Sequence, residues 1–217
     1  MPRYVITFSK KGYIKYTSHL DMIRLFKRAF NRSGIFLEYS EGFNPHPKMS
    51  FAQPLSLGYT ASGELLEFDT KEAFAAGEIK KKMNSNMPGD IRVLDCVQIE
   101  KEKRSLAAKC CAAEYRITIP CSGSLPDNTE KAFMAQENIL VLKKSGKRKA
   151  EKQIDIRKMI RSLNIKERNN NIILSTILDA GSNSNLSPEL LIKAFVDFAG
   201  IEAEREDIEV HRVQIFM

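Results

Sequence analysis

The chain has 217 residues and a mass of 24.6 kDa; 43% of its residues are hydrophobic, and its formal net charge is +7. This composition excludes a disordered or fibrous chain, and the length allows one large domain or two of about 100 residues without disulfide or metal staples. No apolar run approaches the roughly 20 residues of a membrane span, and the N-terminus opens into an alternating segment, so we expect a cytoplasmic protein without membrane contact.

The first half of the chain alternates predicted strands and helices. Residues 3–8 alternate between apolar and polar side chains, which predicts a half-buried strand ending at the turn 10–12. Ser18 and Asp21 form a capping-box pattern before an apolar stripe at helical spacing, and Gly34 stops that stripe, so we expect a helix between them. The rest of this half predicts a strand over 35–39, extended segments over 49–59 and 65–69 around a turn at 61–63, a helix over 71–83 and a strand over 91–99.

The second half repeats this order of elements. Ser187 as N-cap, Pro188 at the first helical position and Gly200 beyond the last turn bracket an amphipathic helix. The other expected elements are a strand over 114–120, a helix over 127–136, a strand over 139–142, a lysine-rich hairpin over 143–149 that leads into residues 153–163, a strand over 172–178 and a closing strand over 208–216.

The order strand, helix, strand, strand, helix, strand is that of a split βαβ unit. We therefore predict an α+β fold made of two ferredoxin-like (split βαβ) units in tandem, with antiparallel sheets and helices on one face. The highly charged segment 100–104 is the expected join, so the units would span residues 1–104 and 105–217.

The positive charge is unevenly distributed along the chain. Residues 1–50 hold nine basic and three acidic residues, and residues 143–168 hold eleven and three, whereas residues 51–142 and 179–217 are acidic overall. Two basic stretches brought together by the fold would form one electropositive face, which is the footprint of a protein that binds phosphate backbones. Taken one at a time, each stretch is also typical of a solvated lysine-rich surface.

Residues 39–51 form a loop that is dense in polar and aromatic side chains. Two prolines frame His46 and, with Gly42, exclude a helix or a central strand. Aromatic rings stack on unpaired bases, and a histidine beside a lysine can contact phosphate or move protons. The alternative is a packed structural loop, in which Phe43 and Phe51 fill the core and His46 caps a backbone carbonyl. The candidate binding residues of this loop are Tyr39, Phe43, Asn44, His46 and Lys48.

His19 and Asp21 stand at the start of the first predicted helix, where free N–H groups and the helix dipole attract anions. Asp21 already has a capping role, so His19 is the better candidate for contact with a phosphate. If the fold brought His19 and His46 together, they would act as general base and general acid in RNA cleavage, with Lys48 stabilising charge. The candidate catalytic residues are therefore His19, His46 and Lys48.

Basic residues also occupy one face of the first predicted helix, opposite its apolar stripe: Arg24, Lys27 and Arg28, with Asn31 beside them. With the basic hairpin they would give about ten positive groups, enough for a strongly salt-dependent interaction with RNA. A lysine-tipped hairpin also protects a sheet edge. Asp155 is predicted to cap a first helical turn, which leaves Arg157 free. The candidate binding residues of the second stretch are Lys143, Lys144, Lys147, Arg148, Lys149 and Arg157.

Several chemistries are excluded by missing motifs. The chain has no Gly-rich phosphate loop, nucleophile elbow or zinc-ligand set, and none of its four cysteines forms a C-x-x-C pair. It also lacks the three-cysteine cluster of a radical S-adenosylmethionine (SAM) enzyme. We therefore expect no metal and no cofactor.

The motifs of the N-terminal half, together with the Asp155-Ile156-Arg157 segment and the helix at Pro188, resemble the bacterial radical-SAM-linked protein family. That family is a domain of unknown function, encoded beside or fused to a cobalamin-binding radical SAM protein, so the resemblance implies a partner and no activity. The residues that carry it are Phe8, Lys11, Gly12, Ser18-His19-Leu20-Asp21, Arg24, the run from Tyr39 to Lys48, Ser50 and Phe51.

We predict a non-catalytic RNA-binding or substrate-presenting accessory module that works with a radical SAM enzyme in tRNA or rRNA modification. One alternative is an RNA-processing enzyme that uses acid and base chemistry of His19 and His46. Another is a protein–protein adaptor without nucleic-acid contact. RNA binding that weakens steeply with salt separates the first two from the adaptor, because the phosphate backbone dominates such binding.

Overall fold

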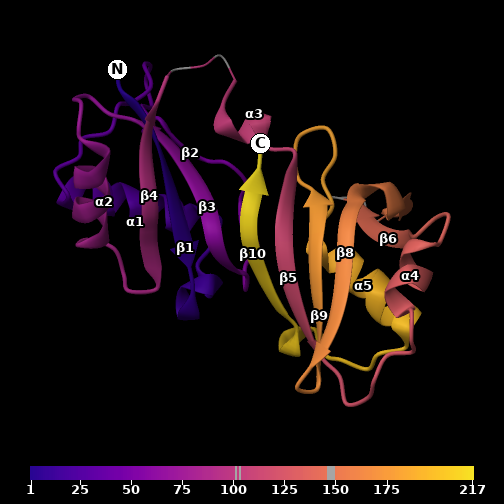
Figure 1. Ribbon diagram of the computed structural model, residues 1–217. Helices are drawn as coiled ribbons and strands as arrows, with labels where there is room; N and C mark the ends of the chain where they lie inside the picture. The colour runs from indigo at the N-terminus through magenta and orange to yellow at the C-terminus, as the bar shows by residue number, and fades with distance from the viewer. Residues whose placement is uncertain (101, 103, 146–149) are drawn as a thin grey trace. The chain divides into compact units, whose positions relative to one another are not determined.

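A computed structural model describes residues 1–217 except 101, 103 and 146–149. The chain has a mixed α+β fold with antiparallel strand pairs (Figure 1). It divides into two compact units, which are described separately below. Unit 1 comprises residues 1–110 and 217, and unit 2 comprises residues 111–216.

The strands of unit 1 are arranged around the first strand of the chain. In this unit β1 pairs antiparallel with β3 and with β4, and the short β2 pairs with β3. Alternation along β1 places Tyr4, Ile6 and Phe8 on one face, and all three are buried. The four strands are β1 (Arg3–Lys10), β2 (Met49–Phe51), β3 (Thr60–Asp69) and β4 (Ile91–Ile99).

Helix α1 (His19–Arg32) begins and ends where its sequence predicts. The backbone N–H of Asp21 donates to Ser18 Oγ at 3.2 Å, and Gly34 has a φ of +67° just beyond the last turn. Helix α1 packs against the Tyr4, Ile6 and Phe8 face of β1 in one hydrophobic cluster, to which α2 (Ala76–Asn84) also contributes. The helical members of this cluster are Met22, Phe26, Ala29, Phe30, Ile79 and Met83.

Two predicted strand features of unit 1 are wrong. Residues 35–39, all within the described chain, form isolated bridges instead of a strand: Leu37 pairs with Thr70, and Tyr39 pairs with Pro47. The turn expected at 61–63 lies inside β3, whose pairing with β1 reaches Ala61 after a register shift between Phe8 and Lys10.

The start of α2 also differs from the prediction. A helix is expected from residue 71, but α2 begins at Ala76. Thr70 Oγ1 donates to the carbonyl of Glu72 at 2.6 Å, and the N–H of Phe74 donates to the Tyr4 hydroxyl at 2.9 Å. These contacts give the backbone of this segment hydrogen-bond partners outside a helix. A last short helix of unit 1, α3 (Leu106–Lys109), directly follows its capping residue Ser105.

The main strands of unit 2 follow the order β10-β5-β9-β8, with antiparallel pairing throughout. Burial alternates along β9, which confirms the strand predicted over 172–178. The strand predicted over 139–142 is present as β6, and it pairs with β7 in a hairpin separate from the main strands. The strands are β5 (Ala112–Pro120), β6 (Leu140–Ser145), β7 (Ala150–Asp155), β8 (Ile160–Arg168), β9 (Asn171–Asp179) and β10 (Glu209–Phe216).

The helices of unit 2 meet through aromatic side chains. Phe133 lies with its ring centroid 5.5 Å from that of Phe195 and 5.2 Å from that of Phe198. Helix α5 is capped by Ser187 and ends before Gly200, as its sequence predicts. The helical elements are α4 (Thr129–Met134), α5 (Pro188–Ala199) and the 3-10 turns η2 (Arg157–Met159) and η3 (Arg205–Asp207).

Asp155 joins the hairpin to the turn that follows it. Its Oδ1 accepts the backbone N–H of Arg157 and that of Ile139, each at 2.9 Å, and these bonds lower the pKa of the carboxyl. A lowered folded-state pKa means that the carboxylate stabilises the fold above its ordinary pKa of 3.8. That contribution is lost as the pH falls through the folded-state pKa.

The variant Asp155→Asn should therefore be less stable than the parent at pH 7, and the difference should shrink as the pH falls below 3.8. Urea unfolding at a series of pH values measures this difference. Asp127→Asn is the control, because that exposed carboxylate has no hydrogen bond within the described chain. A difference for Asp155→Asn that stays constant down to pH 2 would contradict the assignment.

Candidate nucleic-acid interface

The outer face of α1 is basic and open to solvent. Arg24, Arg28 and Asn31 are exposed, and Lys27 is half-buried, while the opposite face packs into the core. Arg24 Nη1 lies 2.9 Å from Asp21 Oδ1, so one of these cations is partly neutralised. The Ser18 hydroxyl and then Arg24 lower the pKa of Asp21, which is therefore a carboxylate at neutral pH.

The loop predicted over 39–51 has a closed neck and an exposed tip. At the neck Tyr39 bridges to Pro47, the N–H of Ser40 donates to the His46 carbonyl at 2.8 Å, and the N–H of His46 donates to Ser40 Oγ at 3.0 Å. Phe43, at the tip, is fully exposed. The alternative in which Phe43 fills the core is therefore wrong, whereas Phe51 does pack against the core cluster.

Side-chain contacts hold the loop against α1. Lys27 Nζ lies 5.4 Å from the centroid of the Tyr39 ring, a cation–π distance. The ring of Phe51 lies 5.4 Å from that of Phe26 in an edge-on arrangement. The helix face and the loop thus share one side of unit 1, which we call the α1–loop surface. It comprises Arg24, Lys27, Arg28, Tyr39, Phe43, Asn44 and His46.

The ammonium group of Lys48 is less available to a bound anion than the other cations of this region. Its Nζ lies 3.9 Å from Glu38 Oε1, and its backbone N–H donates to the carbonyl of the same residue at 2.7 Å. The backbone carbonyl of Lys48 in turn accepts the N–H of Asp69 at 3.0 Å. Lys48 therefore fastens the base of the loop to β3 and contributes less positive charge to the surface.

The structure shows no contact between the two candidate catalytic histidines in the described chain. The His19 ring packs edge-on against Phe51 at 5.4 Å, beside a cavity of about 20 Å³, which holds little more than one water molecule. His46 is not among the residues lining that cavity, and its imidazole has no hydrogen bond within the described residues. The alternative in which His46 caps a backbone carbonyl is therefore wrong as well.

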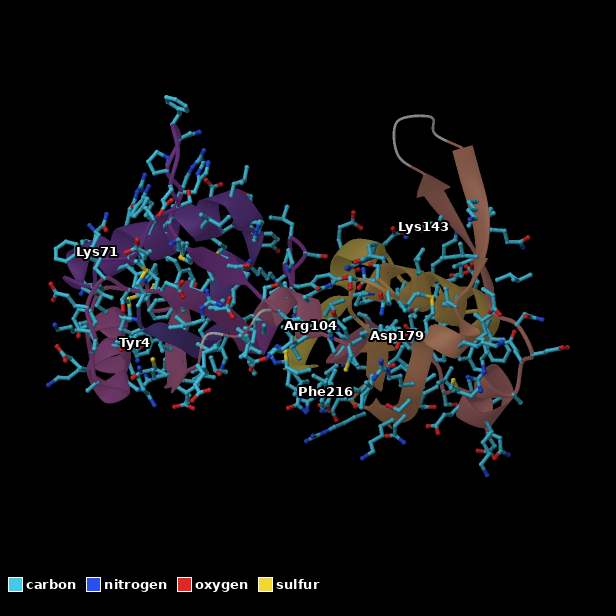
Figure 2. All side chains as sticks on the ribbon, turned by 90° about the horizontal axis from the view of Figure 1, so that it is seen from above. Tyr4, Lys71, Arg104, Lys143, Asp179 and Phe216 are labelled. Atoms are coloured by element: carbon cyan, nitrogen blue, oxygen red, sulfur yellow. The ribbon has the colours of Figure 1, made fainter. Side chains whose placement is uncertain are left out.

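The second basic stretch lies in unit 2, on the hairpin and the turn after it. Lys143 is exposed on β6 (Figure 2). Arg157 is not free as predicted, because its Nε donates to the carbonyl of Met134 at 2.9 Å and so ties the turn to the end of α4. The side chain of Lys144 and the whole of Lys147, Arg148 and Lys149 lie outside the described residues.

Two exposed tyrosines were missed by the sequence reasoning. They lie in the 3-10 helix η1 (Gly12–Tyr16), where Tyr13 is 88% exposed and Tyr16 is 60% exposed. The signal that would have found them is a lysine between two aromatic residues in a short connection, directly before the basic face of α1.

The described residues contain neither a membrane-spanning helix nor a cluster of metal-binding side chains. No helix in the described chain is both long enough and apolar enough to cross a membrane. The residues that the structure describes contain no group of three or more His, Cys, Asp or Glu able to hold a metal ion. Burial raises the pKa of the Cys96 thiol to about 11, so that thiol is protonated at neutral pH.

Sequence comparison places the chain beside bacterial proteins. The family described as "Uncharacterized protein conserved in bacteria (DUF2344)" matches residues 3–188. No curated protein matches the chain significantly.

Three solved structures have a fold similar to that of this chain. A chain of a Cbf5–Nop10–Gar1 complex has a TM-score of 0.55 and 12% identity over 98% of this chain. A chain of an H/ACA ribonucleoprotein bound to a substrate RNA containing 2'-deoxyuridine has a TM-score of 0.52 and 12% identity over 96%. The archaeal box H/ACA Nop10–Cbf5 complex gives 0.51 and 13% over 96%. This chain spans about half of each of those chains, 46–48%, and the likeness is one of fold.

Proposed function

We propose that this chain, which belongs to the DUF2344 family of bacterial proteins, binds RNA on its α1–loop surface and presents it to a modifying enzyme. The observation that carries the proposal is the meeting of the basic helix face with the loop through Lys27 and Tyr39. This contact places the exposed cations of α1 on the same side of unit 1 as the exposed Phe43 and His46 of the loop.

The chemistry of this surface suits a nucleic acid better than a small substrate. Arg28 is exposed and has no ion pair within the described residues, so its guanidinium is available to a phosphate. Phe43 offers both ring faces to solvent at the tip of a loop whose neck is fixed, and unpaired bases stack on such rings. The cavity beside His19 is too small for a substrate larger than water.

The fold comparisons support an RNA-related role. Two of the three solved structures are of H/ACA ribonucleoprotein components, and one of these two holds a substrate RNA. We propose that both units are ferredoxin-like, since the strand order β10-β5-β9-β8 of unit 2 parallels β4-β1-β3-β2 of unit 1. The proposed partner is a radical SAM enzyme acting on tRNA or rRNA, as the resemblance of the sequence motifs implies.

The double variant Arg24→Gln/Arg28→Gln tests the surface. We expect this variant to bind total tRNA or a single-stranded RNA more weakly than the parent protein does at low salt. Titrations at several salt concentrations measure both affinities. The slope of log K against log salt should fall by about 1.4, at roughly 0.7 for each phosphate contact on a single strand.

The control removes the same charge elsewhere. Lys166 and Arg168 are exposed on β8 in unit 2, so Lys166→Gln/Arg168→Gln has the same net charge as the test variant. If both variants weaken binding equally, the interaction depends on net charge alone, and the assignment of RNA binding to the α1–loop surface is wrong. If the parent ignores RNA at about 50 mM salt, the proposed function fails and the protein adaptor is favoured.

A further inference from the structure

The side chains of the 3-10 turn η1, which connects β1 to α1, lie on two opposite sides of the turn. In η1 the side chain of Ile14 packs against the core of unit 1, whereas Tyr13 and Tyr16 point away from it. Tyr13 makes no hydrogen bond or ring contact within the described chain. Aromatic side chains stabilise a fold mainly through the burial of their apolar surface, and a solvent-exposed tyrosine ring contributes little of this stabilisation. The fold therefore gains little from having aromatic rings at these two positions.

The backbone of this turn is held at several points. The buried side chain of Lys10 reaches the carbonyl oxygens of Lys15 and Thr17 at 3.4 and 3.3 Å. The carbonyl of Lys15 also accepts the N–H of Gly58 at 2.9 Å. At the start of the turn the N–H of Lys11 donates to the carbonyl of Asp90 at 2.9 Å.

Gly12 makes this packing possible. Its φ is +55°, and a Cβ at this position would lie 2.4 Å from the carboxylate of Asp90. The turn thus lies against the loop that precedes β4, and any other residue at position 12 would adopt a strained backbone and displace the Asp90 side chain. Two solvent-facing tyrosines stand on a backbone that the core and these hydrogen bonds immobilise.

Positive charge accompanies the rings. Lys15 Nζ lies 5.2 Å from the centroid of the Tyr16 ring, and Lys11 is exposed one residue before the turn. An aromatic ring stacks on a base of any sequence, and a neighbouring lysine pairs with the phosphate that joins successive nucleotides. A rigid turn lowers the entropy cost of such binding, because its backbone needs no further ordering.

We propose that Tyr13 and Tyr16 form a stacking site for unpaired RNA bases. This inference rests on the proposed function and narrows its substrate class to single-stranded or looped RNA. Bases inside a duplex are already stacked on one another and offer no free face to the turn. The chain from Tyr16 runs through His19 into α1, so the stacking site is continuous along the backbone with the α1–loop surface.

The test compares single-stranded and duplex RNA on the full-length protein. The probe is an RNA oligonucleotide of about 12 nucleotides with one 2-aminopurine in its middle, used alone and paired with its complement. Its length lies within the range of site sizes of proteins that bind single strands. Tyr13→Ser/Tyr16→Ser should bind the single strand at least about fivefold more weakly, since each stacked base is worth that much or more. Duplex binding should stay unchanged, and the change in 2-aminopurine fluorescence on binding should become smaller than in the parent.

Two matched variants separate stacking from other effects. Tyr13→Phe/Tyr16→Phe keeps both rings and should bind like the parent. Leu57→Ser removes another exposed apolar side chain of unit 1, 62% exposed, and should also leave binding unchanged. Loss of binding in either variant would overturn the stacking site.

Each failure points to one proposal. If the parent binds the single strand but the serine variant binds it within twofold, the stacking site is wrong and the α1–loop proposal stands. If the serine variant loses single-strand and duplex binding equally, the site is also wrong. If the parent binds neither probe at low salt, the proposed function fails together with this inference.

Discussion

Replacing Phe26 by alanine should lower the free energy of unfolding of unit 1 by about 3–5 kcal/mol. Phe26 is fully buried, and its ring centroid lies 4.9 Å from that of Phe8 and 5.4 Å from that of Phe51. The truncation leaves a cavity among these rings, which join α1, β1 and the end of the loop. RNA binding should fall with stability, because Phe51 anchors one side of the α1–loop surface.

Native-state hydrogen exchange read by mass spectrometry measures this loss, because it follows the amides of unit 1 separately from those of unit 2. Phe36→Ala is the matched control: this ring is 58% exposed, so its removal should change the stability by no more than about 0.5 kcal/mol. A loss below about 1 kcal/mol for Phe26→Ala would contradict the packing described for this core.

Asp69→Ala should destabilise unit 1 by about 3 kcal/mol. The buried carboxylate of Asp69 accepts Arg3 Nε at 2.6 Å and Nη2 at 3.0 Å, and this pairing raises the pKa of Arg3. Arg3 would keep only Glu67, at 3.5 Å, among its ion-pair partners in the described chain. Removing one member of a buried pair costs more than the pair contributes, since a charge is left without its partner.

Urea unfolding of the single and double variants of Arg3 and Asp69 gives the coupling energy directly. The comparison is Glu78→Ala, which breaks an exposed pair with Lys82 at 2.7 Å on α2 and should cost less than about 1 kcal/mol. Equal losses for Asp69→Ala and Glu78→Ala would show that burial adds nothing to the Arg3 pair.

The elements that the sequence predicted best are those with chemical signals at both ends. Ser18 and Gly34 delimit α1, and Ser187, Pro188 and Gly200 delimit α5, because capping side chains and left-handed glycines act locally. Local signals of this kind are readable without knowledge of the fold.

Elements set by distant contacts were harder to predict. Strand β8 is largely exposed and carries charges instead of an alternating pattern, so its pairing with β9 decides its structure. The late start of α2 depends on the Tyr4 hydroxyl, 70 residues away from Phe74. No local pattern encodes such a partner.

The candidate site shows the same division. The basic face of α1 followed from helical spacing, and the rigid loop followed from its prolines. Three other features depend on the three-dimensional fold and could not be predicted. They are the exposure of Phe43, the ion pair of Lys48 with Glu38 and the hydrogen bond from Arg157 to the carbonyl of Met134. Tyr13 and Tyr16 lie between the predicted turn at 10–12 and the predicted cap at Ser18, in a stretch whose sequence carries no pattern that predicts a structure.

The closed neck at Tyr39 and Pro47 has a consequence for divergence within the family. The contacts that close the loop lie below its tip, so residues 41–45 can change in identity or number with little effect on the sheet. Lengthening such a tip costs only about 0.6 kcal/mol for each doubling of the loop. If the α1–loop surface binds RNA as proposed, grafting this short tip should change which RNA is preferred and leave the stability of unit 1, which its core sets, unchanged.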